Sequence, residues 1–139
     1  MNETKAATII RIVLAHYPAV QGIYLFGSHG TQSQWPASDV DIALLLPPEQ
    51  AKSERNLALS QCRFDLEERL HKPIDLLNLR RVSTVMQKEI IGTGSLIYLA
   101  DRYAVEEFEM LVLSFYQKLN EERAEVLAEG LRSGRFYDV

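Results

Sequence analysis

Cysteine is almost absent from this sequence of 139 residues, in which Cys62 is the single example. One cysteine can form no intramolecular disulfide and no cysteine-based zinc site. Cys62 stands at helical spacing among apolar residues, so we expect it to be a small buried hydrophobic side chain.

The sequence also lacks long apolar runs. No run reaches the length needed to cross a membrane. The N-terminal stretch carries Glu3, Lys5 and Arg11 and has no small-residue cleavage site, so it does not resemble a signal peptide. We therefore expect a soluble, cytoplasmic protein.

Basic residues are too few for a protein that binds nucleic acid through charge alone. There are 15 Lys and Arg against 19 Asp and Glu, a net charge of -4 with neutral histidines. A non-specific nucleic-acid binder needs a basic stripe to neutralise phosphates, so we expect no direct nucleic-acid partner. Arg80 and Arg81 could form a local basic patch, but solvated arginines are the simpler interpretation.

The chain is of ordinary length for one domain, and we expect residues 1–139 to form a single domain. Hydrophobic residues make up 47%, which is enough for one core. The periodicity of apolar residues predicts helices over residues 4–16, 49–70 and 82–91, and strands over residues 20–26, 39–46, 74–79 and 96–100. This alternation predicts an α/β or α+β fold with a small mixed sheet flanked by helices.

Two of the predicted helices carry apolar residues in a recognisable pattern. A long C-terminal helix is expected to begin after Asp101 as its N-cap. Its apolar stripe consists of Val105, Phe108, Val112, Phe115 and Leu119. The helix over residues 49–70 has Leu57, Leu59, Cys62, Phe64, Leu66 and Leu70 available for its buried side. Gly92 and Gly94 are expected to end the helix over residues 82–91.

Two aspartates open the second predicted strand, in the order Asp39-Val40-Asp41. Alternate residues of a strand point to the same face, so these two carboxylates should lie side by side. Two ionised carboxylates at that distance repel each other, and a bound divalent cation removes the penalty. Few side-chain oxygens completed by phosphate and water favour Mg²⁺.

The pair Gly27-Ser28 directly follows the first predicted strand. Glycine allows a sharp turn and a close approach of the backbone to a ligand. Backbone N–H groups at such a turn, together with the Ser28 hydroxyl, could hold the β- and γ-phosphates of a nucleotide. The alternative is a Gly-Ser turn followed by a strand that happens to begin with two acids.

A third carboxylate, Asp75, lies between Ile74 and Leu76 in an otherwise apolar predicted strand. An unpaired aspartate there would be costly to bury. If this strand neighbours the second strand, Asp75 can join Asp39 and Asp41 around two metal ions. Asp75 would then be metal ligand and general base for the attacking hydroxyl. Alternatively, Asp75 is an aspartate at a sheet edge that simply faces water.

The segment GSHGTQSQWPASDVDIALLL resembles the GS-x10-D-x-D motif of the polymerase-β-like nucleotidyltransferase superfamily. The short chain is similar to its minimal nucleotidyltransferase (MNT) branch, whose members are commonly antitoxins paired with a HEPN-fold ribonuclease toxin. The resemblance implies the nucleotidyltransferase fold, two Mg²⁺ ions, ATP as donor, and AMP transfer to a tyrosine of the partner toxin. It also implies a complex with that toxin, and the lack of long apolar runs predicts no association with a membrane.

The motif match assigns a role to each site residue. It makes Gly27 and Ser28 phosphate binders, Asp39 and Asp41 metal ligands, and Asp75 the third carboxylate. One departure is His29, because many family members have a basic residue after the serine. Trp35 could stack on the nucleotide base or simply fix its loop to the core.

Other functions remain open from the sequence alone. A small-molecule nucleotidyltransferase of the aminoglycoside-modifying kind would need a further helical domain or a dimer to form its acceptor pocket. An antitoxin acting by contact alone would have no use for the charged residues of the motif. Transfer assays with the product of the neighbouring gene would separate these hypotheses.

Overall fold

A four-stranded mixed sheet with the strand order β3-β2-β1-β4 forms the centre of the molecule. The computed structural model describes residues 4–27 and 39–133, and side chains as far as residue 129. The strands are β1 (Gly22–Phe26), β2 (Val40–Leu45), β3 (Ile74–Asn78) and β4 (Ser95–Leu99). β1 pairs antiparallel with β2 and β4, whereas β2 and β3 are parallel. The third strand therefore neighbours the second, which is the condition that the argument for Asp75 required.

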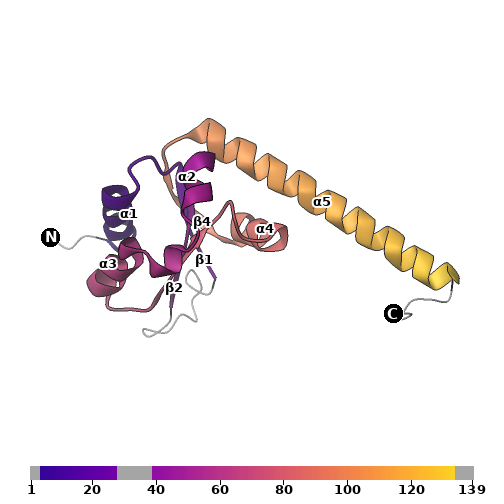
Figure 1. Ribbon diagram of the computed structural model, residues 1–139, viewed down its shortest axis with the longest axis horizontal. Coiled ribbons are helices and arrows are strands. Elements are labelled where there is room, and N and C mark those ends of the chain that lie inside the picture. The colour runs from indigo at the N-terminus through magenta and orange to yellow at the C-terminus, as the bar shows by residue number, and fades with distance from the viewer. Residues whose placement is uncertain (1–3, 28–38, 134–139) are drawn as a thin grey trace.

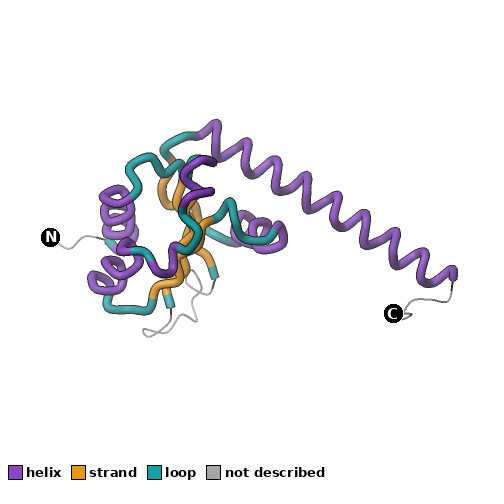
Figure 2. The backbone as a smooth tube through the Cα atoms, in the orientation of Figure 1, coloured by secondary structure: helices purple, strands orange, loops and turns teal. Residues whose placement is uncertain are grey.

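Helices cover both faces of this sheet, which confirms the predicted fold class (Figure 1). α1 (Lys5–His16) and α3 (Gln61–Leu70) lie on one face, with the short helices α2 (Pro48–Ser53) and η1 (Leu57–Leu59) alongside. α4 (Thr84–Thr93) and α5 (Arg102–Ser133) lie on the other face. The tube in Figure 2 shows α5 continuing well beyond the rest of the molecule.

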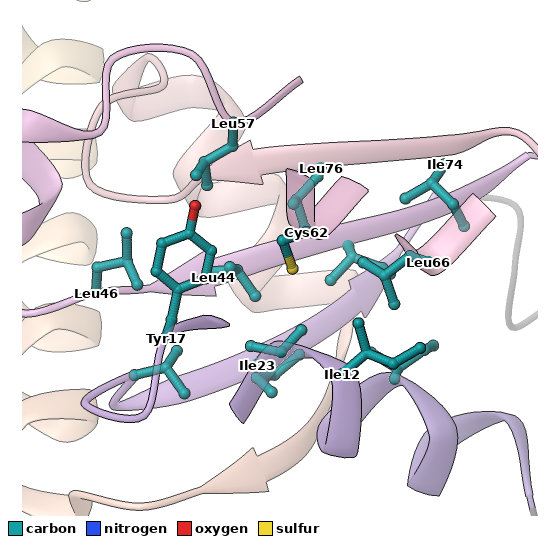
Figure 3. Packing of buried hydrophobic residues seen from close by; sticks show 14 of the residues in the cluster. Ile12, Tyr17, Ile23, Leu44, Leu46, Leu57, Cys62, Leu66, Ile74 and Leu76 are labelled. Atoms are coloured by element: carbon teal, nitrogen blue, oxygen red, sulfur yellow. The ribbon is translucent and has the colours of Figure 1, made fainter. Parts of the chain in front are cut away.

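Each face of the sheet has its own apolar core. Residues that alternate along β2 divide between the two: Ile42 and Leu44 face α1 and α3, and Ala43 and Leu45 face α4 and α5. A strand buried on both faces explains the continuous apolar run of β2. The first core also holds Cys62, which is 1% exposed as expected, among side chains from α1, α3 and three strands (Figure 3).

Side-chain caps start four of the helices. The side-chain oxygens of Thr4, Ser60, Ser83 and Asp101 accept hydrogen bonds from the backbone N–H three residues later, at 3.0–3.2 Å. Each bond satisfies a donor that has no partner within the helix. The expected N-cap role of Asp101 is confirmed.

The single helix expected over residues 49–70 is wrong, because this segment consists of α2, η1 and α3. The side-chain amide of Asn78 donates to the carbonyls of Ala51 and Glu54, both at 3.0 Å. These bonds satisfy carbonyl oxygens at the end of α2, and Ser60 starts a new helix. The break rotates the apolar pattern, so Leu59 and Phe64 are 70% and 46% exposed.

Two smaller expectations also need correction. Gly92 lies inside α4, which ends at Thr93 with Gly94 as its C-cap, and the Gly94 N–H donates to the carbonyl of Ile90 at 2.8 Å. Arg80 is not solvated, because its guanidinium donates to the Leu46 carbonyl at 2.5 Å and to the Gln21 side chain at 2.7 Å. Arg80 thereby joins the ends of two strands.

One hydrogen bond attaches α5 to the sheet. The Tyr24 hydroxyl donates to Glu109 at 2.5 Å. Burial, and the bond to that carboxylate, raise the pKa of Tyr24 well above its ordinary value. The tyrosine is therefore protonated at neutral pH, and the start of α5 is fixed beside β1.

No helix in the described part of the chain is long and apolar enough to span a membrane.

Candidate active site

Asp41 and Asp75 are direct register partners across the parallel pair of β2 and β3. Neighbouring strands lie about 4.8 Å apart, and paired residues present their side chains to the same face. That face is the one covered by α4 and α5, because Ala43 and Leu77, two residues further along, pack there. Asp39 lies two residues before Asp41, just outside β2, and its charge acts on Asp41. The fold therefore pairs Asp41 with Asp75 and leaves Asp39 close enough to interact electrostatically with Asp41.

The electrostatics of Asp41 reflect this arrangement. Burial raises the pKa of the Asp41 carboxyl, and the charges of Asp75 and then Asp39 raise it further. Asp39 and Asp75 are exposed, whereas Asp41 is half-buried between them and the end of β1. Three acids thus interact at one point of the sheet, where a cation would relieve their repulsion.

Gly27 forms the turn that follows β1, directly beside Asp41. Its φ of +74° lies in the left-handed region that favours glycine. A Cβ at this position would be only 2.2 Å from an oxygen of the Asp41 carboxylate. From the sequence, glycine is expected at position 27 because it allows the backbone to come close to a ligand. The structure adds that the Asp41 side chain already occupies the space of the missing Cβ.

The donors fit a hard divalent cation, since they are carboxylate oxygens at the end of the sheet where β2 and β3 begin. Within the described ranges, however, no three His, Cys, Asp or Glu side chains form a ready metal-binding group. The metal-ligand roles of Asp39, Asp41 and Asp75 therefore stay predictions. Ser28, His29 and Trp35 lie outside the described residues, so their predicted roles stay predictions as well.

The C-terminal end of α4 lies against the last residues of β1, which precede the Gly27 turn. A Cβ at Gly94 would lie 2.5 Å from the Ile90 carbonyl, 2.9 Å from the Leu25 carbonyl and 3.3 Å from the Cβ of Phe26. Gly94 thus allows α4 to end directly against the last residues of β1. Sequence analysis assigned this glycine only to the end of a helix, because the contact with β1 depends on tertiary packing.

Replacing Gly27 by alanine should therefore damage the site more than the fold. We expect a loss of about 1–2 kcal/mol in unfolding free energy from the left-handed backbone. The new methyl group must displace the Asp41 carboxylate, and a shift of about 1 Å can cost on the order of a hundredfold in rate. Nucleotide transfer and thermal unfolding would measure the two effects.

Gly92→Ala provides the matched control. Gly92 lies within α4, and a Cβ there meets nothing within 4 Å. Alanine should stabilise the helix by up to about 1 kcal/mol and leave transfer unchanged. Unchanged transfer by the Gly27→Ala protein would contradict the placement of Asp41 in the active site.

The sequence pattern of the family described as "Polymerase beta, Nucleotidyltransferase" matches residues 8–103, which include all four strands and the three carboxylates. The chain belongs to this nucleotidyltransferase family. The predicted superfamily and fold are thereby confirmed.

Three relatives of this nucleotidyltransferase are more specific. The protein adenylyltransferase MntA of Shewanella oneidensis is 32% identical over 127 residues, covering 91% of this chain and 86% of MntA. A crystal structure of a toxin–antitoxin with AMP-PNP has a TM-score of 0.69 and 28% identity, covering 92% of this chain and 99% of the matched chain.

The third relative is a complex of the tri-AMPylated Shewanella oneidensis HEPN toxin with its MNT antitoxin. It matches with a TM-score of 0.62 and 26% identity over 91% of this chain and 96% of the matched chain. These matches extend over nearly the whole sequence, well beyond the motif. The resemblance to the MNT branch is confirmed.

Proposed function

We propose that this nucleotidyltransferase is an antitoxin that transfers AMP from ATP to a tyrosine hydroxyl of a partner HEPN-fold toxin. The observation that carries the chemistry is the register pairing of Asp41 with Asp75, next to the Gly27 turn. The MntA relative and the AMPylated toxin complex support a protein as the acceptor. The nucleotide analogue in a related toxin–antitoxin structure supports ATP as the donor.

The strand order separates the two ends of the reaction. β1 and β3 lie on opposite sides of β2, so the Gly27 turn and Asp75 lie on opposite sides of Asp41. Phosphoryl transfer needs the attacking and leaving oxygens in line on opposite sides of phosphorus. We assign the β- and γ-phosphates to the Gly27-Ser28 turn and the acceptor hydroxyl to the Asp75 side.

Each carboxylate then has a defined task. Asp75 accepts the proton of the toxin hydroxyl while the hydroxyl oxygen forms a bond to the α-phosphorus of ATP. The bond between the α-phosphorus and the oxygen that bridges it to the β-phosphate breaks at the same time. Diphosphate leaves from the Gly27 side. Asp39 and Asp41 would hold the divalent cations, with Mg²⁺ the expected metal and two ions the expected number. Such ions, when bound, neutralise the phosphate charge.

Purified chain and toxin, incubated with ATP and Mg²⁺, should raise the mass of the toxin by whole AMP units, with one diphosphate released per unit. The ribonuclease activity of the toxin should fall in parallel. ATP at about a hundred times its Kd should stabilise the chain by about 2.7 kcal/mol, and EDTA should remove most of this effect.

An identical reaction with EDTA in place of Mg²⁺ is the control. Full neutralisation of the toxin without any gain in mass would contradict the enzyme and favour inhibition by contact. Equal stabilisation by ATP in EDTA would mean that the carboxylates do not bind the nucleotide through a metal.

A further inference from the structure

The buried face of α5 continues past the point where the domain stops covering it. Val105, Phe108 and Val112 follow heptad spacing and are buried against the sheet. The same spacing continues with Phe115, Leu119 and Val126, and Glu122 occupies the heptad position between the last two. Phe115 and Val126 are 56% and 70% exposed. We call Phe115, Leu119 and Val126 the α5 seam.

Most of the seam lies beyond the last ring contact between α5 and α4, in which the Lys88 ammonium stands 5.2 Å from the ring centre of Tyr116. From residue 117 to 129 every side chain except the half-buried Leu119 is exposed. α5 has 32 residues and is therefore about 48 Å long. Figure 1 shows its outer half standing clear of the sheet and of the other helices.

A pocket of about 350 Å³ opens where the seam leaves the domain. Phe108, Val112 and Phe115 of α5 form one wall, and Ala51 and Arg80 lie on the other side. The guanidinium of Arg80 stands 5.4 Å from the ring centre of Phe108, and Lys52 and Arg81 also line the pocket. The seam and the α5 wall of the pocket therefore lie along one side of the helix, whereas the rest of the pocket lining is largely basic. Apolar surfaces of this kind on soluble proteins mark sites of interaction.

The spacing and charge of α5 indicate what occupies this surface. Heptad spacing matches a second helix, whose side chains insert between those of the seam. Between residues 102 and 129, α5 carries seven Glu against three Lys and Arg. A second copy of α5 would bring a like-charged helix alongside, which is unfavourable. A helix with an apolar side is complementary to the seam, and basic flanks fit residues 120–129, where α5 carries four Glu against one Arg.

The comparisons associate α5 with the toxin–antitoxin relatives in particular. The family pattern ends at residue 103, so α5 lies outside the part shared by nucleotidyltransferases in general. The match to the toxin–antitoxin structure with AMP-PNP covers 92% of this chain and must therefore include most of α5. The helix is thus an addition common to this chain and that relative.

We propose that the α5 seam and its pocket dock a helix of the toxin, apolar on one side and basic at its flanks. This inference rests on the proposed function, because the toxin is the acceptor. α5 packs on the same face of the sheet as the side chains of Asp41 and Asp75. A toxin held by the seam therefore lies on the catalytic side of the sheet, which raises the local concentration of the acceptor hydroxyl.

The test compares two double substitutions of equal charge on opposite sides of α5. Leu119→Lys with Val126→Lys changes the seam, and Gln117→Lys with Ala124→Lys changes the far side. Binding of the full chain to the toxin is measured without ATP by calorimetry, and AMP transfer is measured separately. We expect the seam variant to bind at least about a hundredfold more weakly and to raise the KM for toxin, and the far-side variant to bind as wild type does.

Further readouts keep the result interpretable. Both variants should keep the helical circular dichroism and the stabilisation by ATP and Mg²⁺, because Leu119 is only half-buried and the other changed residues are exposed. Wild-type binding and transfer by the seam variant would overturn the docking surface and leave the enzyme intact. A wild-type dimer that the seam variant abolishes, with toxin binding unchanged, would also overturn it. If the wild-type chain binds the toxin through the seam but transfers no AMP to it, the proposed function is rejected and the docking surface stands.

Discussion

Replacing Asp39 and Asp41 together by alanine should reduce AMP transfer at least about a hundredfold while leaving the fold intact. The two carboxylates are the proposed metal ligands, and the reaction depends on the charge neutralisation that the metal provides. Burial and the charges of Asp75 and Asp39 raise the pKa of Asp41, so in the absence of metal these groups oppose folding at neutral pH. In EDTA the double variant should therefore unfold at the same temperature as wild type or higher.

The sign of this effect depends on pH. A carboxyl with a raised folded-state pKa binds its proton more tightly when folded, so its contribution favours folding at low pH. That contribution is lost as the pH rises through the raised pKa. The stability advantage of the variant should thus be present at neutral pH and disappear below the ordinary pKa of aspartate.

Asp65→Ala is a control with the opposite pattern. The Asp65 carboxylate contacts His16 at 2.6 Å between α3 and α1, remote from the active site in the fold. Hydrogen bonds from Gln61 and His16 lower the pKa of Asp65, so it favours folding above its ordinary pKa. Its removal should lower stability modestly at neutral pH and leave transfer unchanged.

Transfer by the Asp39 and Asp41 double variant at more than a few per cent of the wild-type rate would reject the two carboxylates as metal ligands.

The sequence predicted the strands and a small mixed sheet, because the decisive signals are local. Ile42 to Leu46 is a continuous apolar run that a doubly buried strand explains, and Asp39 and Asp41 stand just before it. Pairing Asp75 with Asp41 required only the neighbouring position of β3 and β2. The parallel register then placed the two carboxylates side by side, as the functional argument required.

The parts that sequence analysis missed depend on distant residues. The sequence of residues 49–70 gives no sign that Asn78, in β3, donates hydrogen bonds to the last carbonyls of α2. The five-residue stripe of α5 was predicted correctly as a pattern, but only its first three members are buried. Periodicity identifies an apolar face, and what covers that face depends on how far the sheet extends.

Asp75→Asn should separate nucleotide binding from chemistry. Asparagine has nearly the same shape as aspartate, but it carries no charge and cannot accept the proton of the acceptor hydroxyl. General bases contribute about 10²–10⁴-fold to rate, so we expect turnover to fall by about that factor. Asp75 lies on the side of Asp41 away from the Gly27 turn, so Mg²⁺-dependent ATP affinity should change by less than about tenfold.

Single-turnover transfer to the toxin and thermal stabilisation by ATP and Mg²⁺ would measure the two quantities on the same protein. Asp41→Asn is the matched comparison, since it makes the same chemical change one strand away and should impair both binding and turnover. Loss of the Asp75 charge should also let the pKa of Asp41 fall towards its ordinary value, which a pH titration of the variant would detect. Asp75→Asn protein that neutralises the toxin fully, with no AMP added to it, would show that the carboxylates serve contact rather than catalysis.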